Sequence, residues 1–269
     1  MSSSDARPKV SLSTSLAVQL RVIRALMIRE AQGKYSPETL GFFWVIAEPM
    51  ILTCGVIVLW TLTRQGGKSA NVSIVALALT AYSHIQLWRL TVLGSMRSLQ
   101  SGGWLFYHHN VNALDLLLAK GLLQSVSIFA SFVLVCGVCV MWDIFPPVRD
   151  PGLIVAAWCL DSLFCISFSI VVAALSEFSE VIEKFLHPLM YLTLPLTGAF
   201  TMTSWLPPRA RAAIEWSPLA NACEMFRAGV FPLSVKTYWS ASFILVASLA
   251  LLSVGLPLVA YARKQISVQ

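Results

Sequence analysis

Residues 40–53 read LGFFWVIAEPMILT, an apolar run that is interrupted by Glu48 and Pro49. A carboxylate is costly to place against lipid, so Glu48 is expected to face other protein rather than the bilayer. Pro49 lacks a backbone N–H and is expected to bend the helix that carries it. The stretch therefore predicts the first part of a membrane-spanning helix whose single carboxylate points into protein.

The composition indicates a membrane protein along the whole chain. Of the 269 residues, 57% are hydrophobic and only 12% are charged, and the mean hydropathy is +0.73. A soluble domain has about a quarter of its residues charged, so this composition excludes a water-soluble protein. The polar start MSSSDARPKV lacks the apolar core of a signal peptide, and no cleaved leader is expected.

Six windows are apolar and long enough to cross the bilayer, which takes about 20 residues of helix. They are Phe42–Leu62, Val72–Leu93, Leu116–Trp142, Leu153–Leu175, Pro188–Met202 with some flank, and Trp239–Tyr261. The fifth window is the shortest, and Pro188, Pro195 and Gly198 are expected to break it. We therefore predict an all-α membrane protein with six transmembrane helices.

Lysine and arginine set the expected orientation, because cytoplasmic loops carry an excess of them. Basic residues precede the first window and follow the last: Arg7, Lys9, Arg21, Arg24, Arg29, Lys34, Arg263 and Lys264. This predicts a cytoplasmic N-terminus at 1–38, a membrane domain at 39–262 and a cytoplasmic tail at 263–269. The connection after the fifth window opposes the rule, because it should lie outside yet carries Arg209, Arg211, Arg227 and Lys236.

The segment Ser11–Arg29 is amphipathic rather than spanning. Its apolar side chains recur at spacings of three and four, at Leu12, Leu16, Leu20, Ile23 and Met27. This pattern is typical of a helix that lies along a membrane surface with its arginines toward anionic headgroups. We predict an interface helix on the inner leaflet, either as a plain anchor or in contact with a cytoplasmic partner as well.

The longest connection, SWLPPRARAAIEWSPLANACEMFRAGVFP, contains two short helix signatures. The first begins at Pro207–Pro208 and runs to about Trp216. Ser217 is expected to cap the second, with Pro218 at its first position and Gly229 just past its end. Short segments at membrane depth survive only inside protein or beside a water-filled cavity. We therefore predict re-entrant or interfacial helices at the outer mouth of a pore.

Three further ionisable side chains fall within predicted spans. Arg89 and Lys120 lie near the inner ends of their spans, where long stems can carry a charge to the interface. Asp161 is nearer the middle of its span and is too short to do so. We expect it to face protein or water, with a basic residue of a neighbouring span as its partner.

Nine tryptophans are many for a chain of this length. Trp60, Trp142 and Trp239 fall at predicted outer interfaces, as an aromatic belt would place them. The alternative use of such rings is to line a path and stack against the apolar faces of sugars.

No catalytic or metal-binding constellation is evident in the sequence. The stretch RQGGKSA at 64–70 ends like a phosphate-binding loop, but Leu62 stands where the Walker A pattern requires glycine. The histidines are not at metal-ligand spacing with carboxylates. We predict a chain that is not an enzyme, has no metal or cofactor of its own, and binds no nucleic acid.

Several motifs together resemble one family. REAQGKYSPETLGFFWVIAEPMIL is similar to the basic run and the LG-x-x-W-x-x-x-EP start of the first span in ABC-type polysaccharide export permeases. QSGGWLFYHHNVNALDLLLAK resembles their cytoplasmic connection between spans two and three, and FSEVIEKFLHPLMYLTLPLTGAF resembles their acidic loop and fifth span. The outer segment carries their W-x-P-L signature. The likeness covers roughly residues 15–262 and is strongest to membrane subunits of capsular polysaccharide exporters, the KpsM-like branch.

The resemblance implies a homodimer in the bacterial inner membrane that associates with two separate ATP-hydrolysing subunits. ATP and Mg would be bound by those subunits, and no cofactor by this chain. The cargo would be a glycolipid-anchored polysaccharide, and a periplasmic export protein is a further expected partner. Glu48 would then face either the helix bundle or the dimer interface.

Three groups of site residues follow from the resemblance and from the residue chemistry. The substrate path is predicted to include Trp44, Glu48, Tyr82, Trp88, Arg89, Trp205 and Trp216. Attraction of the negatively charged lipid linker is predicted for Arg24, Arg29 and Lys34, with Arg89 as a further basic residue that could contribute. Coupling to the ATPase is predicted for the segments Gln100–Asp115 and Phe178–Phe185, at Gln100, Phe106, Tyr107, Asn110, Asp115, Phe178 and Glu180.

Three alternatives stay open at the level of sequence. A permease for another cell-surface glycan, O-antigen or teichoic acid, would have the same architecture. A membrane-embedded acyltransferase or glycan polymerase would need a catalytic set of His, Asp or Glu, which the sequence does not display. A self-powered secondary transporter would show inverted repeats with paired broken helices, whereas here only the fifth window is broken. Dependence on a separate ATPase subunit distinguishes these classes.

Overall fold

The computed structural model describes residues 12–34, 41–63, 72–96, 98, 112–199 and 201–266. All regular elements within these ranges are helical, as predicted. The α-helices are α1 (Leu12–Lys34), α2 (Gly41–Thr63), α3 (Ile74–Ser95), α5 (Ala113–Met141), α6 (Pro151–Phe178), α7 (Glu180–Leu192), α8 (Pro208–Ile214), α9 (Pro218–Val230) and α10 (Ala241–Ile266). Two 3₁₀ turns, η3 (Leu194–Thr197) and η4 (Thr203–Trp205), lie between α7 and α8.

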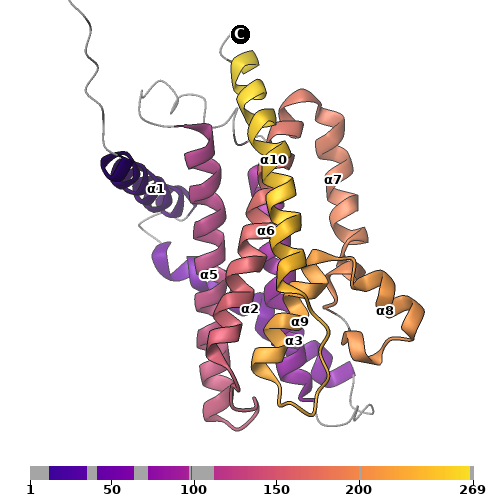
Figure 1. Ribbon diagram of the computed structural model, residues 1–269. Helices are drawn as coiled ribbons and strands as arrows, with labels where there is room; N and C mark the ends of the chain where they lie inside the picture. The colour runs from indigo at the N-terminus through magenta and orange to yellow at the C-terminus, as the bar shows by residue number, and fades with distance from the viewer. Residues whose placement is uncertain are drawn as a thin grey trace, which may run out of the picture.

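Three helices in the described part of the chain are long and apolar enough to cross a membrane: α5, α6 and residues Ala241–Arg263 of α10. They stand side by side in an upright bundle, with α6 between the other two (Figure 1). α2 and α3, of 23 and 22 residues, also have the length that a span requires. The all-α membrane architecture is therefore confirmed, while the number of six spans stays a prediction.

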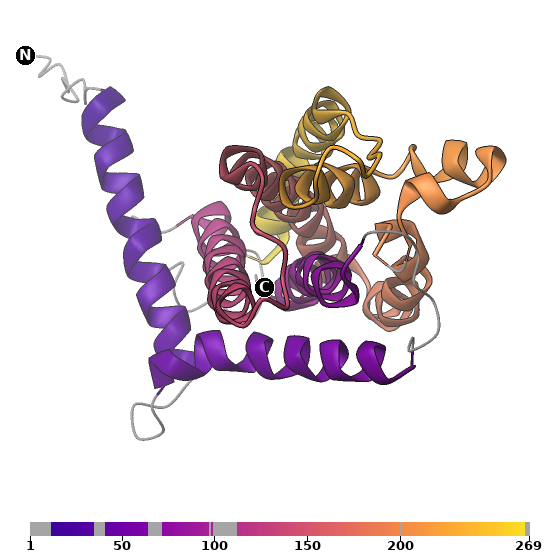
Figure 2. The ribbon, with the colours of Figure 1, turned by 90° about the horizontal axis from the view of Figure 1, so that it is seen from below.

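α1 lies across the bundle rather than along it. In Figure 1 this helix is seen nearly end-on while the long helices stand upright, and in Figure 2 it is seen along its side, as is the oblique α2. The later half of α1 packs on the start of α5, where Leu26 contacts Leu116 and Ala119. The earlier half leaves Leu16 and Leu20 about 60% exposed. The predicted apolar face is thus divided between protein contact and an open surface, as an interface helix requires.

The fifth predicted span has a different form from the one expected. Pro188 lies inside α7 and does not end it, which corrects the prediction that this proline breaks the segment. The helix continues because Leu186 and Met190, on either side of the proline, are both buried against the bundle. The break falls at η3, which begins near Pro195 and is ended by Gly198 in a left-handed conformation (φ +67°). α7 alone has 13 residues, too few to cross a bilayer.

The segment Phe178–Phe185, predicted as a coupling loop, is mostly helical. α6 continues to Phe178, and α7 begins at Glu180. Ser179 alone separates them, and its side chain accepts a hydrogen bond from the Val181 N–H at 3.2 Å. The sharp turn arises because one residue with extended backbone ends the first helix and caps the second.

The two short helices predicted between the fifth and sixth windows form close to their predicted positions, as α8 and α9. Ser217 caps α9 by accepting a hydrogen bond from the Ala220 N–H, and it donates a second one to the Leu196 carbonyl at 2.7 Å. Gly229, however, lies inside the last turn of α9 rather than past its end, which corrects that prediction. A Cβ at this position would come within 2.7 Å of Ile154 and 2.9 Å of the Asp150 carbonyl oxygen. The glycine therefore permits close packing of α9 on the start of α6.

Candidate functional site

A buried arginine fixes the turn that follows α7. The side chain of Arg227, on α9, is fully buried and donates hydrogen bonds to the carbonyl oxygens of Gly198 and Ala199, both at 2.8 Å, and of Thr201 at 3.2 Å. It also pairs with Glu224 at 3.3 Å. Because carbonyls freed at the end of η3 have no helical partner, the guanidinium supplies the donors that they need.

Glu224 and Arg211 hold the backbone that follows this turn, at residues 203–206, and the Tyr238 segment before α10. Glu224 accepts hydrogen bonds from the backbone N–H groups of Thr203, at 3.2 Å, and Tyr238, at 3.4 Å. Arg211, on α8, donates to the carbonyls of Thr203, Ser204 and Leu206 and lies 4.5 Å from the centre of the Tyr238 ring. Arg211 and Arg227 are thus bound to backbone carbonyls within the fold. They should not be counted as free loop charges when lysine and arginine residues are used to assign the orientation of the chain in the membrane.

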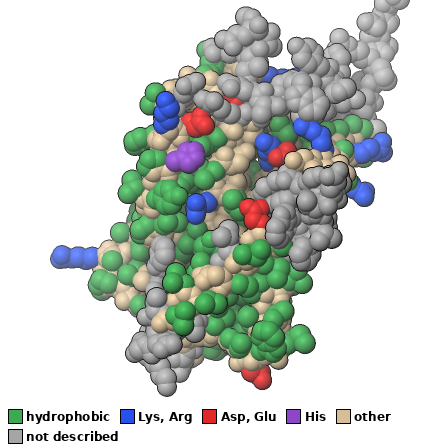
Figure 3. Space-filling view, turned by 180° about the vertical axis from the view of Figure 1, so that it is seen from behind, with side chains coloured by type: hydrophobic (Ala, Val, Ile, Leu, Met, Phe, Trp, Pro, Cys, Tyr) green, Lys and Arg blue, Asp and Glu red, His purple; other side chains and the backbone are tan. Residues whose placement is uncertain are grey.

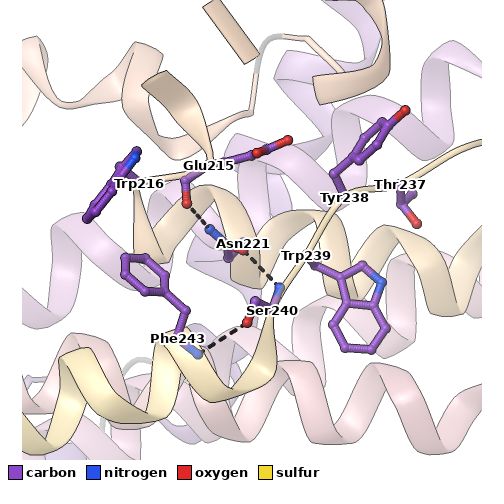
Figure 4. A pocket seen from close by; sticks show the side chains of 8 residues that line it. All are labelled: Glu215, Trp216, Asn221, Thr237, Tyr238, Trp239, Ser240 and Phe243. Atoms are coloured by element: carbon purple, nitrogen blue, oxygen red, sulfur yellow. Dashed lines mark hydrogen bonds between the residues drawn. The ribbon is translucent and has the colours of Figure 1, made fainter. Parts of the chain in front are cut away.

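An open hollow of about 530 Å³ lies beside these ties, between the end of α8 and the start of α10 (Figure 4). Its lining residues are Glu215, Trp216, Asn221, Thr237, Tyr238, Trp239, Ser240 and Phe243. Trp216 is 80% exposed, and its ring meets Phe243 edge to face at 6.2 Å. The hollow presents aromatic surface of the kind that sugar rings contact, and it includes one of the predicted path residues.

A histidine and an aspartate form a buried pair at the centre of the bundle. His84 Nδ1, on α3, lies 2.6 Å from Asp161 Oδ2, on α6, and both residues are at most 2% exposed. The imidazole also contacts the rings of Trp158 and Phe226, so the pair joins α3, α6 and α9. The expectation that Asp161 faces protein with a basic partner on a neighbouring helix is confirmed.

The face between α3 and α7 holds a second arginine in a different setting. Trp88, which is 3% exposed, donates from its indole N–H to Thr193 Oγ1 at 3.2 Å. The next residue, Arg89, is half-buried, with its guanidinium carbon 5.3 Å from the centre of the Tyr191 ring. Arg89 makes no hydrogen bond or ion pair with the described residues, and its Nε is buried without an acceptor. About two turns earlier on α3, Tyr82 packs against a small apolar cluster that includes Ile85 and Ala199.

The start of α5 ties three helices together. Asp115 accepts a hydrogen bond from the Asn112 N–H at 3.1 Å and from Gln19, on α1, at 3.0 Å. Asn112 accepts one from Arg263, near the end of α10, at 3.2 Å. One to two turns further along α5, Lys120 lies 3.7 Å from Glu30 of α1. These contacts hold α1 and α10 to the end of α5 that follows the predicted coupling segment.

The remaining predicted site residues are placed as follows. Arg24 and Trp205 are exposed, Phe178 is 39% exposed beside Tyr261, and Arg29 and Glu48 are half-buried. Gln100, Phe106, Tyr107 and Asn110 lie outside the described residues, as do the side chains of Lys34, Trp44 and Glu180. The structure brings Tyr82, Trp88 and Arg89 to the α3–α7 face, whereas Trp205 and Trp216 belong to the separate α8 region.

Two polar pairs in the bundle, His84 with Asp161 and Glu224 with Arg227, were not recognised as pairs from the sequence. His84 has no metal-ligand spacing, but its position in an apolar run is a signal that it needs a buried partner. Glu224 and Arg227 fall in the helix predicted to follow Ser217, and their spacing of three residues is that of an ion pair, but only the charge of Arg227 enters the orientation predicted from the sequence.

The long apolar helices, the helix across their end and the buried polar ties define an all-helical membrane protein. The described surface seen from behind fits this class, being largely hydrophobic, with charged side chains more frequent at the end where α1 lies (Figure 3).

Comparison with curated proteins then identifies the family. The chain is 31% identical over 261 residues to the capsule polysaccharide export inner-membrane protein BexB of Haemophilus influenzae, covering 97% of this chain and 98% of that protein. Identity and coverage are the same for the capsule polysaccharide export inner-membrane protein CtrC of Neisseria meningitidis serogroup B. The polysialic acid transport protein KpsM of Escherichia coli is 22% identical over 248 residues. A scan against models of protein families finds no match.

The chain therefore belongs to the family of capsule polysaccharide export inner-membrane proteins. This confirms the family that the motifs of the first span, the cytoplasmic connection and the outer helices indicated.

Proposed function

We propose that this chain is the membrane-spanning subunit of an ATP-driven exporter that moves lipid-linked capsular polysaccharide across the bacterial inner membrane. The observation that carries the proposal is similarity over nearly the whole chain to proteins named for capsule polysaccharide export at the inner membrane. The long apolar helices and the crosswise α1 support it, because a membrane permease needs both spans and an anchor at the surface.

The proposed topology has six spans with both ends of the chain in the cytoplasm. α1 and the end of α10 lie toward the same end of the bundle, which is compatible with this arrangement (Figure 1). The basic residues after α7 oppose it less than their number suggests, because Arg211 and Arg227 are bound by carbonyl groups within the fold.

The proposed assembly is a homodimer with two ATP-binding subunits, which would hold ATP and Mg. The exposed side of α7 offers an apolar contact surface, since Val181, Phe185 and Leu192 are 68–71% exposed. The segment around Gln100, Phe106, Tyr107 and Asn110, with Phe178 and Glu180, would receive movement from the ATPases. The ties at Asp115 would then pass that movement to α1, α5 and α10. A periplasmic export protein is proposed as a further partner on the outer side.

The proposed substrate path includes the α3–α7 face and the aromatic hollow beside α8, with Trp44 and Glu48 of α2 as further members. Arg24, Arg29 and Lys34 of α1 would attract the anionic linker at the inner leaflet. An exporter of another cell-surface glycan would share this architecture, so the identity of the cargo is part of the test.

The experiment is to delete the gene from its host, restore it on a plasmid with an affinity tag, and measure polymer at the cell surface and inside the cell. We expect deletion to retain polymer inside, and the tagged chain to restore export and co-purify with an ATP-hydrolysing subunit. Normal capsule in the deletion strain, with loss of O-antigen or teichoic acid instead, would transfer the function to that cargo. A purified chain without an ATPase, from cells that still depend on it for export, would contradict the ABC class.

A further inference from the structure

Arg89 is a cation without an anionic partner among the described residues, inside a helix of spanning length. It lies six residues before Ser95, the end of α3, and its guanidinium rests over the ring of Tyr191 on α7 at 5.3 Å. Its Nε is buried without a partner, whereas the two terminal nitrogens are neither enclosed nor hydrogen-bonded to a described residue. By contrast, Lys120, the other basic residue that sequence placed in a span, reaches Ser98 at 3.0 Å and Glu30 at 3.7 Å.

Simple extension toward the membrane surface does not account for this arrangement. An arginine that extends to the membrane interface places its whole guanidinium group in water. Here the guanidinium of Arg89, on α3, instead lies over the Tyr191 ring of α7, and its Nε is buried. Bare exposure of this cation to hydrocarbon is unfavourable. The open edge of the guanidinium must therefore face a polar path or a bound anion.

The environment suits an oxyanion in particular. The ring of Tyr191 covers one face of the guanidinium, so the in-plane edge with its terminal N–H groups stays free. That edge matches two oxygens of a carboxylate or phosphate, which form paired charge-assisted hydrogen bonds with arginine. The side-chain hydrogen bond from Trp88 to Thr193, the residue directly after α7, links α3 to the end of α7 beside it, which helps the cation and the ring keep their spacing.

We propose that Arg89 and Tyr191 form an anion-binding subsite on the export path, which takes a carboxylate or phosphate group of the exported glycolipid. The inference rests on the proposed export function and assigns that function a specific chemical contact. Two sources share the chemistry: acidic groups along the polymer, and the phosphate of the lipid anchor. The half-buried setting holds one anionic group at a time and releases it, because a single stacked arginine gives limited affinity.

Export by variants tests the subsite in the deletion strain described above. We expect Arg89→Gln to lower surface polymer by about tenfold or more, as loss of a charge-assisted hydrogen bond predicts, while membrane levels are unchanged. Arg89→Lys keeps the charge but loses the flat fork, and should fall between Arg89→Gln and wild type. Tyr191→Phe keeps the ring and should export normally, whereas Tyr191→Leu should lose export several-fold. Arg209→Gln removes an exposed cation on α8 and is the matched control.

Binding is measured separately on the purified chain in phosphatidylcholine nanodiscs, by its tryptophan fluorescence. The probes are an oligosialic acid, a phosphodiester-linked glycan oligomer and neutral dextran. A response to either acidic oligomer that Arg89→Gln abolishes places the anion on the polymer. A response only when phosphatidylglycerol replaces part of the phosphatidylcholine, again lost in Arg89→Gln, places it on the lipid. Equal responses of wild type and Arg89→Gln to every probe would overturn the subsite.

Two further outcomes separate this inference from the proposed function. Wild type that restores export, together with Arg89→Gln that exports equally well, would overturn the subsite and leave the exporter standing. Loss of co-purified ATPase or of the dimer in Arg89→Gln would assign Arg89 to a subunit interface, which also overturns the subsite. If wild type fails to restore export, the proposed function fails, and the nanodisc measurements still decide whether Arg89 binds anions.

Discussion

Two arginines in helices of this protein differ in how fully their donors are used. Arg227 is completely buried, and its guanidinium bonds to three carbonyl oxygens and to Glu224. Arg89 is half-buried, lies over one aromatic ring and bonds to no acceptor in the described part of the chain. The first arrangement is closed: both terminal nitrogens are bonded, and Nε, which has no acceptor, is buried as well. The second is open, which is the condition that a transient ligand requires.

The difference shows how a permease can combine rigidity with a moving cargo. The region of α8, α9 and the turn at Gly198 is fastened by side-chain ties to backbone, so it is expected to move as a unit. The α3–α7 face is held by one hydrogen bond between Trp88 and Thr193 and by packing. The charge that serves stability and the charge that serves transport should therefore separate in mutational experiments.

The largest effect is expected at the closed arginine. Arg227→Ala leaves Glu224 buried without its cation and three carbonyls without donors, which typically costs about 3–5 kcal/mol. The free energy of unfolding is measured by denaturant titration in a fixed detergent, with Arg209→Ala as the exposed control. A loss below about 1 kcal/mol would mean that the hydrogen bonds and the ion pair of Arg227 contribute little to stability, and the contrast with Arg89 would disappear.

The pair of His84 and Asp161 is expected to behave like Arg227 but with a smaller effect. Asp161→Leu or His84→Phe alone leaves a buried polar partner, and each should lower the free energy of unfolding by about 2–3 kcal/mol. The double variant should lose clearly less than the sum, because no polar group is then left unpaired. The same titration of all four proteins gives the coupling, and strictly additive losses would show that the two side chains do not interact.

The sequence predicted the long helices because each apolar run fixes both length and environment, and α5, α6 and α10 formed within a few residues of their windows. It also predicted the Ser217 cap, which depends on neighbouring residues only. It failed where distant contacts decide: Pro188 stays inside α7 because Leu186 and Met190, two residues away on either side, are buried.

Less of the candidate site than of the fold could be predicted from the sequence. Asp161 could be expected to need a partner, but its partner His84 is 77 positions away, and spacing along the chain does not show which spans are neighbours. The setting of Arg89 over Tyr191 likewise depends on how α7 packs beside α3. The sequence therefore shows which polar side chains in apolar segments need a partner, and only the packing of the helices shows which residues they contact.

A third prediction tests how tightly the closed region is packed. Gly229→Ala would bring a methyl group within 3 Å of Ile154 and of the Asp150 carbonyl oxygen, which should cost about 1–3 kcal/mol as an overpacked contact. Gly94→Ala is the matched control, because nothing lies within 4 Å of its added Cβ and alanine favours a helix by about 0.5–1 kcal/mol. Equal melting temperatures for the two variants would indicate that α9 can shift away from α6, contrary to a rigid unit.

The smallest effect on stability is expected at Arg89, and it is the most direct test of the difference between Arg89 and Arg227. Arg89→Met keeps the apolar stem and removes a cation that has no acceptor among the residues that the structure describes, so the free energy of unfolding should change by less than about 1 kcal/mol in either direction. Arg89→Met should nevertheless impair export as Arg89→Gln does. A loss of several kcal/mol would instead make Arg89 a structural residue like Arg227, because a charge whose removal unfolds the protein cannot have been held free for cargo.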